Sequence, residues 1–125
     1  MIDCLAVGLG GCIGSILRYL IGKIPVETNG FPIHTLGINV IGCFLIGLIV
    51  SLATKNTQMD PRLVLFFKTG VCGGFTTFST FSLETQQLMQ TGQYTMAIIY
   101  VLLSILLGIF AIFAASRSRE IRFAP

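Results

Sequence analysis

The longest uninterrupted hydrophobic run is the feature that most constrains what this chain can fold into. The stretch from Thr95 to Ala115 contains no charged side chain, and about 20 such residues in a helix cross the ~30 Å hydrocarbon core of a bilayer. Three further hydrophobic segments, over residues 4–24, 35–54 and 63–90, precede it. The sequence therefore predicts an all-α integral membrane protein, with four transmembrane helices in a single domain.

Composition supports a membrane protein and argues against several other classes. The chain is 54% hydrophobic and only 10% charged, whereas soluble domains carry roughly 25% charged residues. Intrinsic disorder needs the opposite composition, and a net charge of +3 is too small to indicate a nucleic-acid partner. A soluble enzyme is disfavoured on the same grounds, and we expect no catalytic residues.

The third hydrophobic segment is not a clean span. Glycines and then a run of Thr, Ser and Phe interrupt it between Gly70 and Ser82. Glycine and β-branched threonine are poor helix formers, so we expect helix to about Val71, a non-helical break over Gly73–Ser79, and helix again to about Gln90. Because non-helical backbone survives at membrane depth only where protein buries it or it lines a cavity, the break marks a candidate functional site.

Polar residues inside the hydrophobic segments need either partners or a function, because an unsatisfied polar group is costly in hydrocarbon. Asn39 either joins helices or lines a pore, and Arg18 is either an interfacial anchor or a cation beside a polar vestibule. For Glu84 there are three alternatives: it pairs with Arg18, it lines a water-filled path, or it is buried in its protonated form. Tyr100 and Ser104 share one face of the fourth helix, as an interhelical contact or as a polar track.

Two phenylalanines lie within the Thr and Ser run. Phe78 and Phe81 are three residues apart, which places both rings on nearly one face of a helix. Ring edges carry partial positive charge, so two edges turned inward would contact a small anion without a formal charge. A helix break also frees backbone carbonyls, which are natural ligands for Na⁺, and a bound cation would help to admit an anion.

The four cysteines do not indicate redox or metal chemistry. Cys4, Cys12, Cys43 and Cys72 have no CxxC spacing and no histidine cluster nearby. We interpret them as small buried hydrophobic side chains.

The distribution of basic residues predicts the orientation of the helices. An even number of helices places both termini on one side, which also carries Lys55, Arg62 and the basic tail over residues 116–125. Basic segments favour the cytoplasm, so we expect both termini there and the tail in water.

Three stretches form a recognisable set of motifs. They are Gly73–Ser82, with the sequence GGFTTFSTFS, Gly10–Tyr19, with the sequence GGCIGSILRY, and Thr35–Asn39, with the sequence TLGIN. Together they closely resemble the signatures of the CrcB/Fluc fluoride channel family, in which the second and third read GGxxGxxxR(W/Y) and GTLxxN. The similarity covers nearly the whole chain, including its length and four-helix layout.

The resemblance implies a fluoride-selective passive channel of the inner membrane, which exports cytoplasmic fluoride, excludes chloride and confers fluoride resistance. Members of the family are antiparallel, dual-topology dimers whose third helices break near the midplane. A central structural Na⁺ is held at the dimer interface by backbone carbonyls, and the matching positions here are Gly73 and Thr76 of each subunit.

The resemblance also implies a fluoride path. Phe78 and Phe81 match the phenylalanines that meet fluoride edge-on, Asn39 matches the pore asparagine, and Arg18 matches the vestibule arginine. The full candidate set is Asn39, Phe78, Phe81, Ser79, Thr80, Glu84, Tyr100, Ser104 and Arg18.

Three features depart from the family pattern. His34 stands where the family usually has glycine, and Gly108 stands where many relatives have a serine on the fourth helix. The side that carries the termini is also more basic than the other. The partner is therefore either a second copy of this chain or an oppositely oriented homologue.

Two other functions stay open at this point. A small dual-topology, proton-coupled multidrug exporter needs an embedded carboxylate early in the chain, where this sequence has Arg18. A non-transporting structural subunit is compatible with glycine-rich packing and Asn39, but it gives no reason for the Thr, Ser and Phe run.

Overall fold

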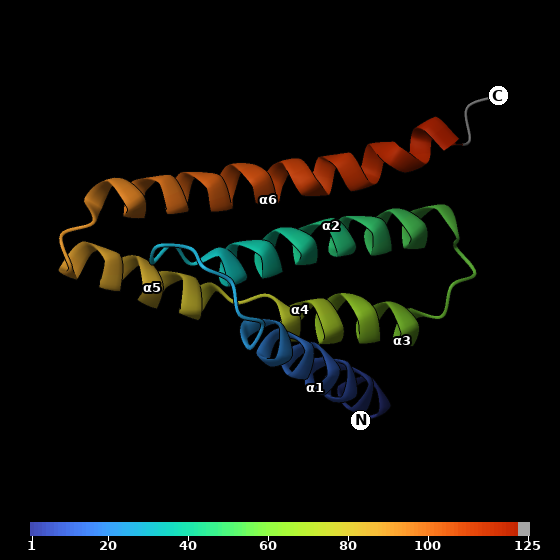
Figure 1. Cartoon of the computed structure of the whole chain (residues 1–125). Coiled ribbons are helices and arrows are strands. Elements are labelled where there is room, and N and C mark those ends of the chain that lie inside the picture. The colour runs from blue at the N-terminus through green and yellow to red at the C-terminus, as the bar shows by residue number, and fades with distance from the viewer. Residues whose placement is uncertain (123–125) are drawn as a thin grey trace.

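The computed structural model describes the backbone of residues 1–122 and the side chains of residues 1–117. These residues form helices joined by loops (Figure 1). The elements in chain order are α1 (Ile2–Gly22), α2 (Ile33–Lys55), α3 (Pro61–Val64), η1 (Leu65–Cys72), α4 (Gly73–Phe75), α5 (Phe78–Gln90) and α6 (Tyr94–Arg122).

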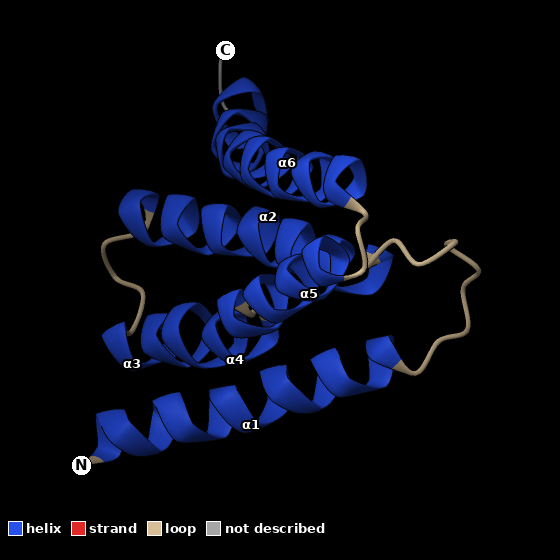
Figure 2. Cartoon of the chain, turned by 90° about the vertical axis from the view of Figure 1, so that its left-hand side faces the viewer, coloured by secondary structure: helices blue, strands red, loops and turns tan. Residues whose placement is uncertain are grey.

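Three of the helices are long and apolar enough to cross a membrane, over Ile2–Gly22, Ile33–Lys55 and Tyr94–Arg117. Helix α6 packs along α2, and α1 packs along η1 and α4. Figures 1 and 2 show the N-terminus and the α2–α3 loop at the same end of the molecule. The chain is thus an all-helical membrane protein.

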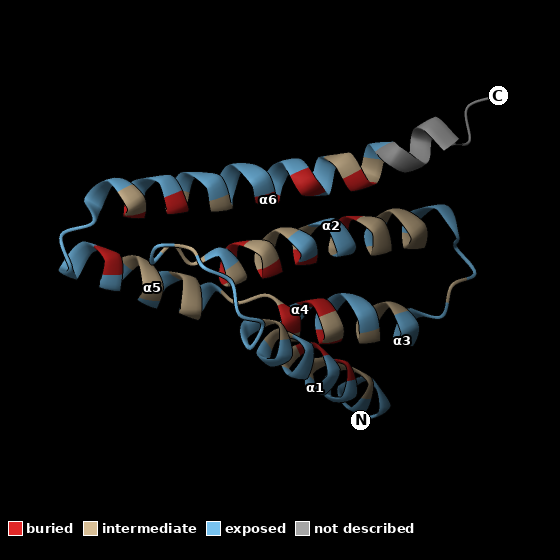
Figure 3. Cartoon of the chain, in the orientation of Figure 1, coloured by how far each residue is buried: buried red, intermediate tan, exposed pale blue. Residues whose placement is uncertain are grey.

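The outer surface of the molecule is apolar. On α6 the side chains of Leu106, Phe110 and Phe113 are 62%, 69% and 66% exposed, and the outer faces of α1 and α6 are exposed along most of their length (Figure 3). A contiguous apolar surface of this kind indicates contact with a membrane or with another protein.

Glycines set the close packing of α1 on the third segment. A methyl group on Gly14 would overlap the backbone of η1 and α4, and Gly10 lies against Gly70 in the same way. Gly74 lies against the backbone of Gly11. In lipid, where apolar burial between helices gives little driving force, such close backbone approach is the main source of helix association.

Within the third segment, residues 61–90, the backbone leaves the helix only at Thr76 and Thr77, which are extended and lie between α4 and α5. The expected non-helical stretch over Gly73–Ser79 is therefore wrong in extent. Helix persists to Phe75, and Gly74 in this stretch packs against the backbone of Gly11 on α1, so tertiary contact overrides the weak helix preference of glycine. The helix restarts at Phe78 because the Thr77 hydroxyl accepts a hydrogen bond from the Thr80 backbone N–H, the usual contact of a helix N-cap.

Two helical features differ from the sequence-based expectation. Residues Leu65–Cys72 form a π-helix, which hydrophobicity does not predict. Helix α6 continues to Arg122, past the expected end at Ala115, because no glycine or proline lies between Gly108 and Arg122. We expected a solvent-exposed tail over residues 116–125. Most of it lies outside residues 1–117, whose side chains the structure describes.

The cysteines are not all buried within the chain. Cys72 is buried and Cys43 is half-buried, but Cys4 and Cys12 are exposed. The expectation of burial is wrong for these two, because α1 packs only through its glycine-rich face.

Candidate functional site

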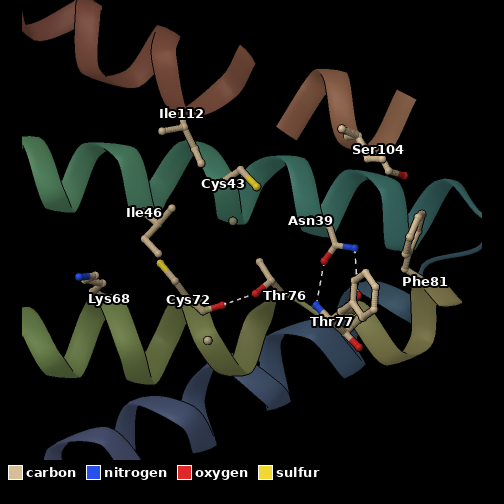
Figure 4. Close-up of a pocket in the computed structure, with 14 residues that line it drawn as sticks. Asn39, Cys43, Ile46, Lys68, Cys72, Thr76, Thr77, Phe81, Ser104 and Ile112 are labelled. Carbon is tan, nitrogen blue, oxygen red and sulfur yellow. Dashed lines mark hydrogen bonds between the residues drawn. The ribbon is translucent and has the colours of Figure 1, made fainter. Parts of the chain in front are cut away.

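The extended backbone between α4 and α5 is held by one side chain of α2. The Asn39 Nδ2 donates to the Thr77 carbonyl oxygen at 3.1 Å, and the Thr77 N–H donates to the Asn39 Oδ1 at 2.8 Å (Figure 4). This pair of hydrogen bonds satisfies both backbone groups of a residue that has left the helix. At the break, the Asn39 side chain thereby replaces the backbone hydrogen bonds that a regular helix would supply.

Hydroxyl groups complete the break. The Thr76 Oγ1 donates to the Cys72 carbonyl at 2.8 Å, and the Thr77 Oγ1 donates to the Thr80 Oγ1 at 3.1 Å. The Ser79 Oγ lies 3.3 Å from the Thr77 Oγ1. The threonines that weaken the helix therefore also supply hydrogen-bond partners at its interruption.

The carboxylate of Glu84 has two hydroxyl partners. The Thr35 Oγ1 donates to its Oε1 and the Tyr100 hydroxyl donates to its Oε2, both at 2.7 Å. Thr35 is buried and Tyr100 has no exposed surface within the chain. Of the alternatives for Glu84, the structure favours a hydrogen-bonded carboxyl group rather than an ion pair with Arg18.

An aromatic group packs against Tyr100, one of the two partners of Glu84. The ring centroids of Phe81 and Tyr100 lie 5.1 Å apart, and those of Phe78 and Phe81 lie 5.7 Å apart. Phe31 meets Tyr100 edge-on at 5.6 Å. Phe81 is partly buried in this group, whereas Phe78 is 78% exposed, so the Phe81 ring is held within the chain and most of the Phe78 ring is uncovered.

A cavity of about 420 Å³, which we call the Asn39 cavity, runs between α2, the third segment and α6 (Figure 4). Its lining includes Asn39, Cys43, Ile46, Lys68, Cys72, Thr76, Thr77, Phe78, Phe81, Ser104 and Ile112. The Ser104 Oγ is buried and has no hydrogen-bond partner within the described residues. The cavity thus combines apolar walls with a few polar groups near the break.

A second cavity of about 490 Å³, which we call the Arg18 cavity, lies beside α1. Its lining includes Ser15, Arg18, Lys23, His34, Thr35, Thr77, Thr80 and Glu84. The Arg18 Nε donates to the Gly74 carbonyl at 3.2 Å, which satisfies an end carbonyl of α4. Since Thr77 lines both cavities, the break lies between a mostly apolar cavity and one lined by side chains of both charges, Arg18, Lys23 and Glu84.

The structure divides the candidate residues between these cavities. Asn39, Phe78, Phe81 and Ser104 line the Asn39 cavity, and Arg18, Thr80 and Glu84 line the Arg18 cavity. Tyr100 lies beneath them as the partner of Glu84, and Ser79 lines neither cavity.

Sequence reasoning missed three residues of this region. Thr35 belongs to one of the family motifs but was predicted no role of its own, yet it donates to Glu84. A carboxyl group in an apolar segment indicates that such a donor is near. Thr77 is the backbone partner of Asn39. Lys68, a cation within the third hydrophobic segment, lines the Asn39 cavity, and its charge alone could have marked it.

Comparisons with known proteins identify the family. The model of the family described as CrcB-like protein, Camphor Resistance (CrcB), matches residues 5–116. The fluoride-specific ion channel FluC of Azobacteroides pseudotrichonymphae is 45% identical over 108 residues, covering 85% of this chain and 86% of that protein. The protein of the same name from Ruminiclostridium cellulolyticum is 48% identical over 107 residues, covering 84% and 82%. That of Helicobacter pylori strain G27 is 47% identical over 112 residues, covering 86% and 85%. With this match over most of its length, the chain belongs to the CrcB family.

Proposed function

We propose that this chain is a fluoride-selective passive ion channel of the inner membrane, which exports cytoplasmic fluoride and so confers fluoride resistance. It is not an enzyme, because its family is one of ion channels. The observation that carries the proposal is the break at Thr76 and Thr77, capped by Asn39 and bordered by Phe78 and Phe81 in one cavity. Irregular backbone within a membrane segment is tolerated where protein buries it or where it lines a cavity, and here it lines one.

In the anion path we propose, the groups that contact fluoride carry partial positive charges rather than a formal charge. Phe78 and Phe81 present ring edges, which are positive, and Asn39 retains one amide N–H beyond the one given to Thr77. The hydroxyl groups of Ser79, Thr80 and Ser104, with the Glu84 and Tyr100 pair, continue the polar contacts, and Arg18 stands at the vestibule. These donors replace the water around fluoride, in a path that is too narrow for the larger chloride.

The fourth membrane crossing is made, in this proposal, by the third segment as a whole. The helices on its two sides, Pro61–Phe75 and Phe78–Gln90, are each too short to span ~30 Å at 1.5 Å per residue. Together they are long enough, with the break near the midplane.

A second copy of the chain, inserted antiparallel, completes the channel in this proposal, and an oppositely oriented homologue is the alternative partner. The exposed Phe78 ring and the apolar outer faces support a partner at this surface.

A central Na⁺ fits the carbonyl groups left by the break. The last four carbonyls of a helix lack intrahelical partners; here Thr76 uses that of Cys72 and Arg18 uses that of Gly74. Gly73 is exposed, and no side chain among the described residues donates to its carbonyl. We propose that the Gly73 and Thr76 carbonyls of two subunits hold Na⁺, for which oxygen ligands of this kind are suitable.

The physiological role follows from elementary acid–base chemistry. Hydrofluoric acid crosses membranes uncharged, dissociates in a less acidic cytoplasm and leaves fluoride trapped. A membrane potential of ~100 mV, negative inside, is worth ~2.3 kcal/mol per charge, or roughly fortyfold in concentration. A passive channel therefore suffices for export.

The multidrug-exporter alternative finds no support in α1. The only carboxylate of that helix is Asp3, at its first turn. Asp3 is exposed and lies 3.3 Å from the Arg62 Nε. It is therefore placed at an end of the helix rather than within the membrane, where a proton-coupled exporter needs it.

The test in cells compares fluoride with cationic dyes. Expression in a fluoride-sensitive bacterial strain should restore growth in fluoride and leave sensitivity to ethidium unchanged. Phe81→Ile should abolish that protection, whereas Phe113→Ile, at an outward-facing ring of α6, should retain it at the same protein level. Protection against ethidium, or full fluoride resistance with Phe81→Ile, would refute the proposal.

A separate test addresses Na⁺. The purified protein should be more heat-stable in Na⁺ than in N-methylglucamine at equal ionic strength. Equal stability in the two solutions would argue against a structural Na⁺ without affecting the fluoride assignment.

A further inference from the structure

Lys68 is the only charged residue among the described residues that line the Asn39 cavity, and it is exposed. Lys68 lies on η1, roughly two turns before Thr76, or about 12 Å along a helix axis at ~1.5 Å per residue. The proposed anion path uses the other end of the same cavity, where Asn39, Thr77 and Phe81 lie. Lys68 and the candidate anion ligands therefore line the same cavity.

The direction of the Lys68 side chain places its charge at the end of this cavity. Figure 4 shows Lys68 at the far end from Asn39 and Phe81, with its amino group turned away from the break. That end faces the side of the molecule that carries α3 and the α2–α3 loop (Figure 1). A lysine that reaches from an apolar segment toward water is common, but here its stem also forms part of the cavity wall.

The helix that carries Lys68 has two different faces. Lys68, Cys72 and Thr76 line the cavity, whereas Gly70 and Gly74 lie against α1. The segment is a π-helix from Leu65 to Cys72, a form that is rare and frequently found at functional sites. The cation is thus held on the cavity face by a helix whose opposite face is fixed by close packing.

The Arg18 cavity, on the other side of the break, has its own basic residues. Arg18, Lys23 and His34 line it together with the carboxyl group of Glu84. Thr77 is common to both cavities. Each approach to the break therefore contains at least one basic side chain. Fixed positive charge in a cavity with low-dielectric walls raises the local anion concentration and the rate of entry.

We propose that Lys68 is an entry residue that attracts fluoride into the Asn39 cavity from the side of the N-terminus and the α2–α3 loop. This inference rests on the proposed function, because it assigns a role within the fluoride path. It concerns the rate of anion entry rather than selectivity, since Lys68 lies away from the proposed ligands at the break.

The test measures initial fluoride efflux from liposomes at low fluoride concentration, with four purified variants of equal reconstitution. Lys68→Met removes the charge and keeps the apolar stem, Lys68→Gln is a second neutral form should the first fold poorly, and Lys68→Arg restores the charge. Arg62→Gln is the matched control, because it removes one positive charge from an exposed site six positions earlier.

Lys68→Met should slow efflux by roughly fivefold at about 10 mM ionic strength, the Boltzmann factor for two unit charges about 4 Å apart in water. The difference should shrink at about 150 mM salt, where the Debye length falls from ~30 Å to ~8 Å. Lys68→Arg and Arg62→Gln should remain close to the unmodified protein, and chloride should stay excluded in all four.

Three results would overturn the inference. Unchanged efflux with Lys68→Met at low salt would show that the charge has no role. A loss that does not depend on salt and that arginine does not rescue would indicate a packing role. An equal loss with Arg62→Gln would indicate an effect of net charge. Absence of fluoride efflux from the unmodified chain would instead refute the proposed function, and this inference with it.

Discussion

The hydrogen bonds between Asn39 and Thr77 lead to the most specific prediction. Asn39→Leu keeps nearly the same side-chain volume and removes both the donor and the acceptor that hold the break. The Thr77 N–H and carbonyl then lose their partner from α2 in a membrane segment, where water is not at hand to replace it.

The expected cost follows from the two groups. A buried polar group left unsatisfied costs about 1–3 kcal/mol, so two such groups set an upper range of about 2–6 kcal/mol. Side-chain hydrogen bonds measured in membrane proteins average only ~0.6 kcal/mol each, because other partners are found, which sets a lower bound of about 1 kcal/mol. Since Asn39 is only partly buried, we expect a loss of about 1–4 kcal/mol in the free energy of unfolding.

The assay is reversible unfolding in mixed micelles by titration with SDS, followed by far-UV circular dichroism. Asn56→Leu is the matched control, because Asn56 accepts one exposed hydrogen bond from the Gln58 N–H in the α2–α3 loop and should change stability by less than about 0.5 kcal/mol. Fluoride efflux with Asn39→Leu should fall at least about tenfold, equivalent to ~1.4 kcal/mol. Unchanged stability and efflux with Asn39→Leu would refute the role of Asn39 at the break.

Three further predictions concern packing, the carboxyl cluster and the cysteines. Gly14→Ala should destabilise the protein by about 1–3 kcal/mol because its methyl group would overlap the backbone of η1 and α4; Gly8→Ala, which meets no neighbour, should be neutral or stabilising, and equal effects in SDS titration would contradict the packing. Tyr100→Phe and Thr35→Val each remove one donor to Glu84, so a double-mutant cycle should show coupling of about 0.5–3 kcal/mol; strict additivity would count against a shared carboxyl. Replacement of all four cysteines by serine or alanine should leave efflux within about twofold, and a complete loss would revive a thiol-based function.

Much of the fold could be predicted from local composition. The charge-free stretch from Thr95 to Ala115 and the hydrophobic stretch before Thr54 correspond to helices α6 and α2, because length and apolarity decide these elements. The interruption in the third segment was also evident from its threonines and glycines. Its extent was not, since whether Gly74 stays helical depends on contact with Gly11 on another helix.

The partners of the polar residues could not be predicted from local sequence. Asn39 bonds to Thr77, and Thr35 bonds to Glu84, across separations of 38 and 49 residues. Such pairs depend on how helices are aligned in space, which hydrophobicity does not determine. The π-helix that contains Lys68 is likewise a consequence of packing, since no residue type in it demands that form.

The central claim, selective fluoride conduction by this chain, is tested most directly by efflux from liposomes that contain only the purified protein. A fluoride electrode follows release down a gradient, and a chloride electrode follows the same vesicles loaded with chloride. The account predicts rapid release of fluoride without release of chloride. Folded, reconstituted protein that releases no fluoride, or that releases chloride equally well, would contradict it.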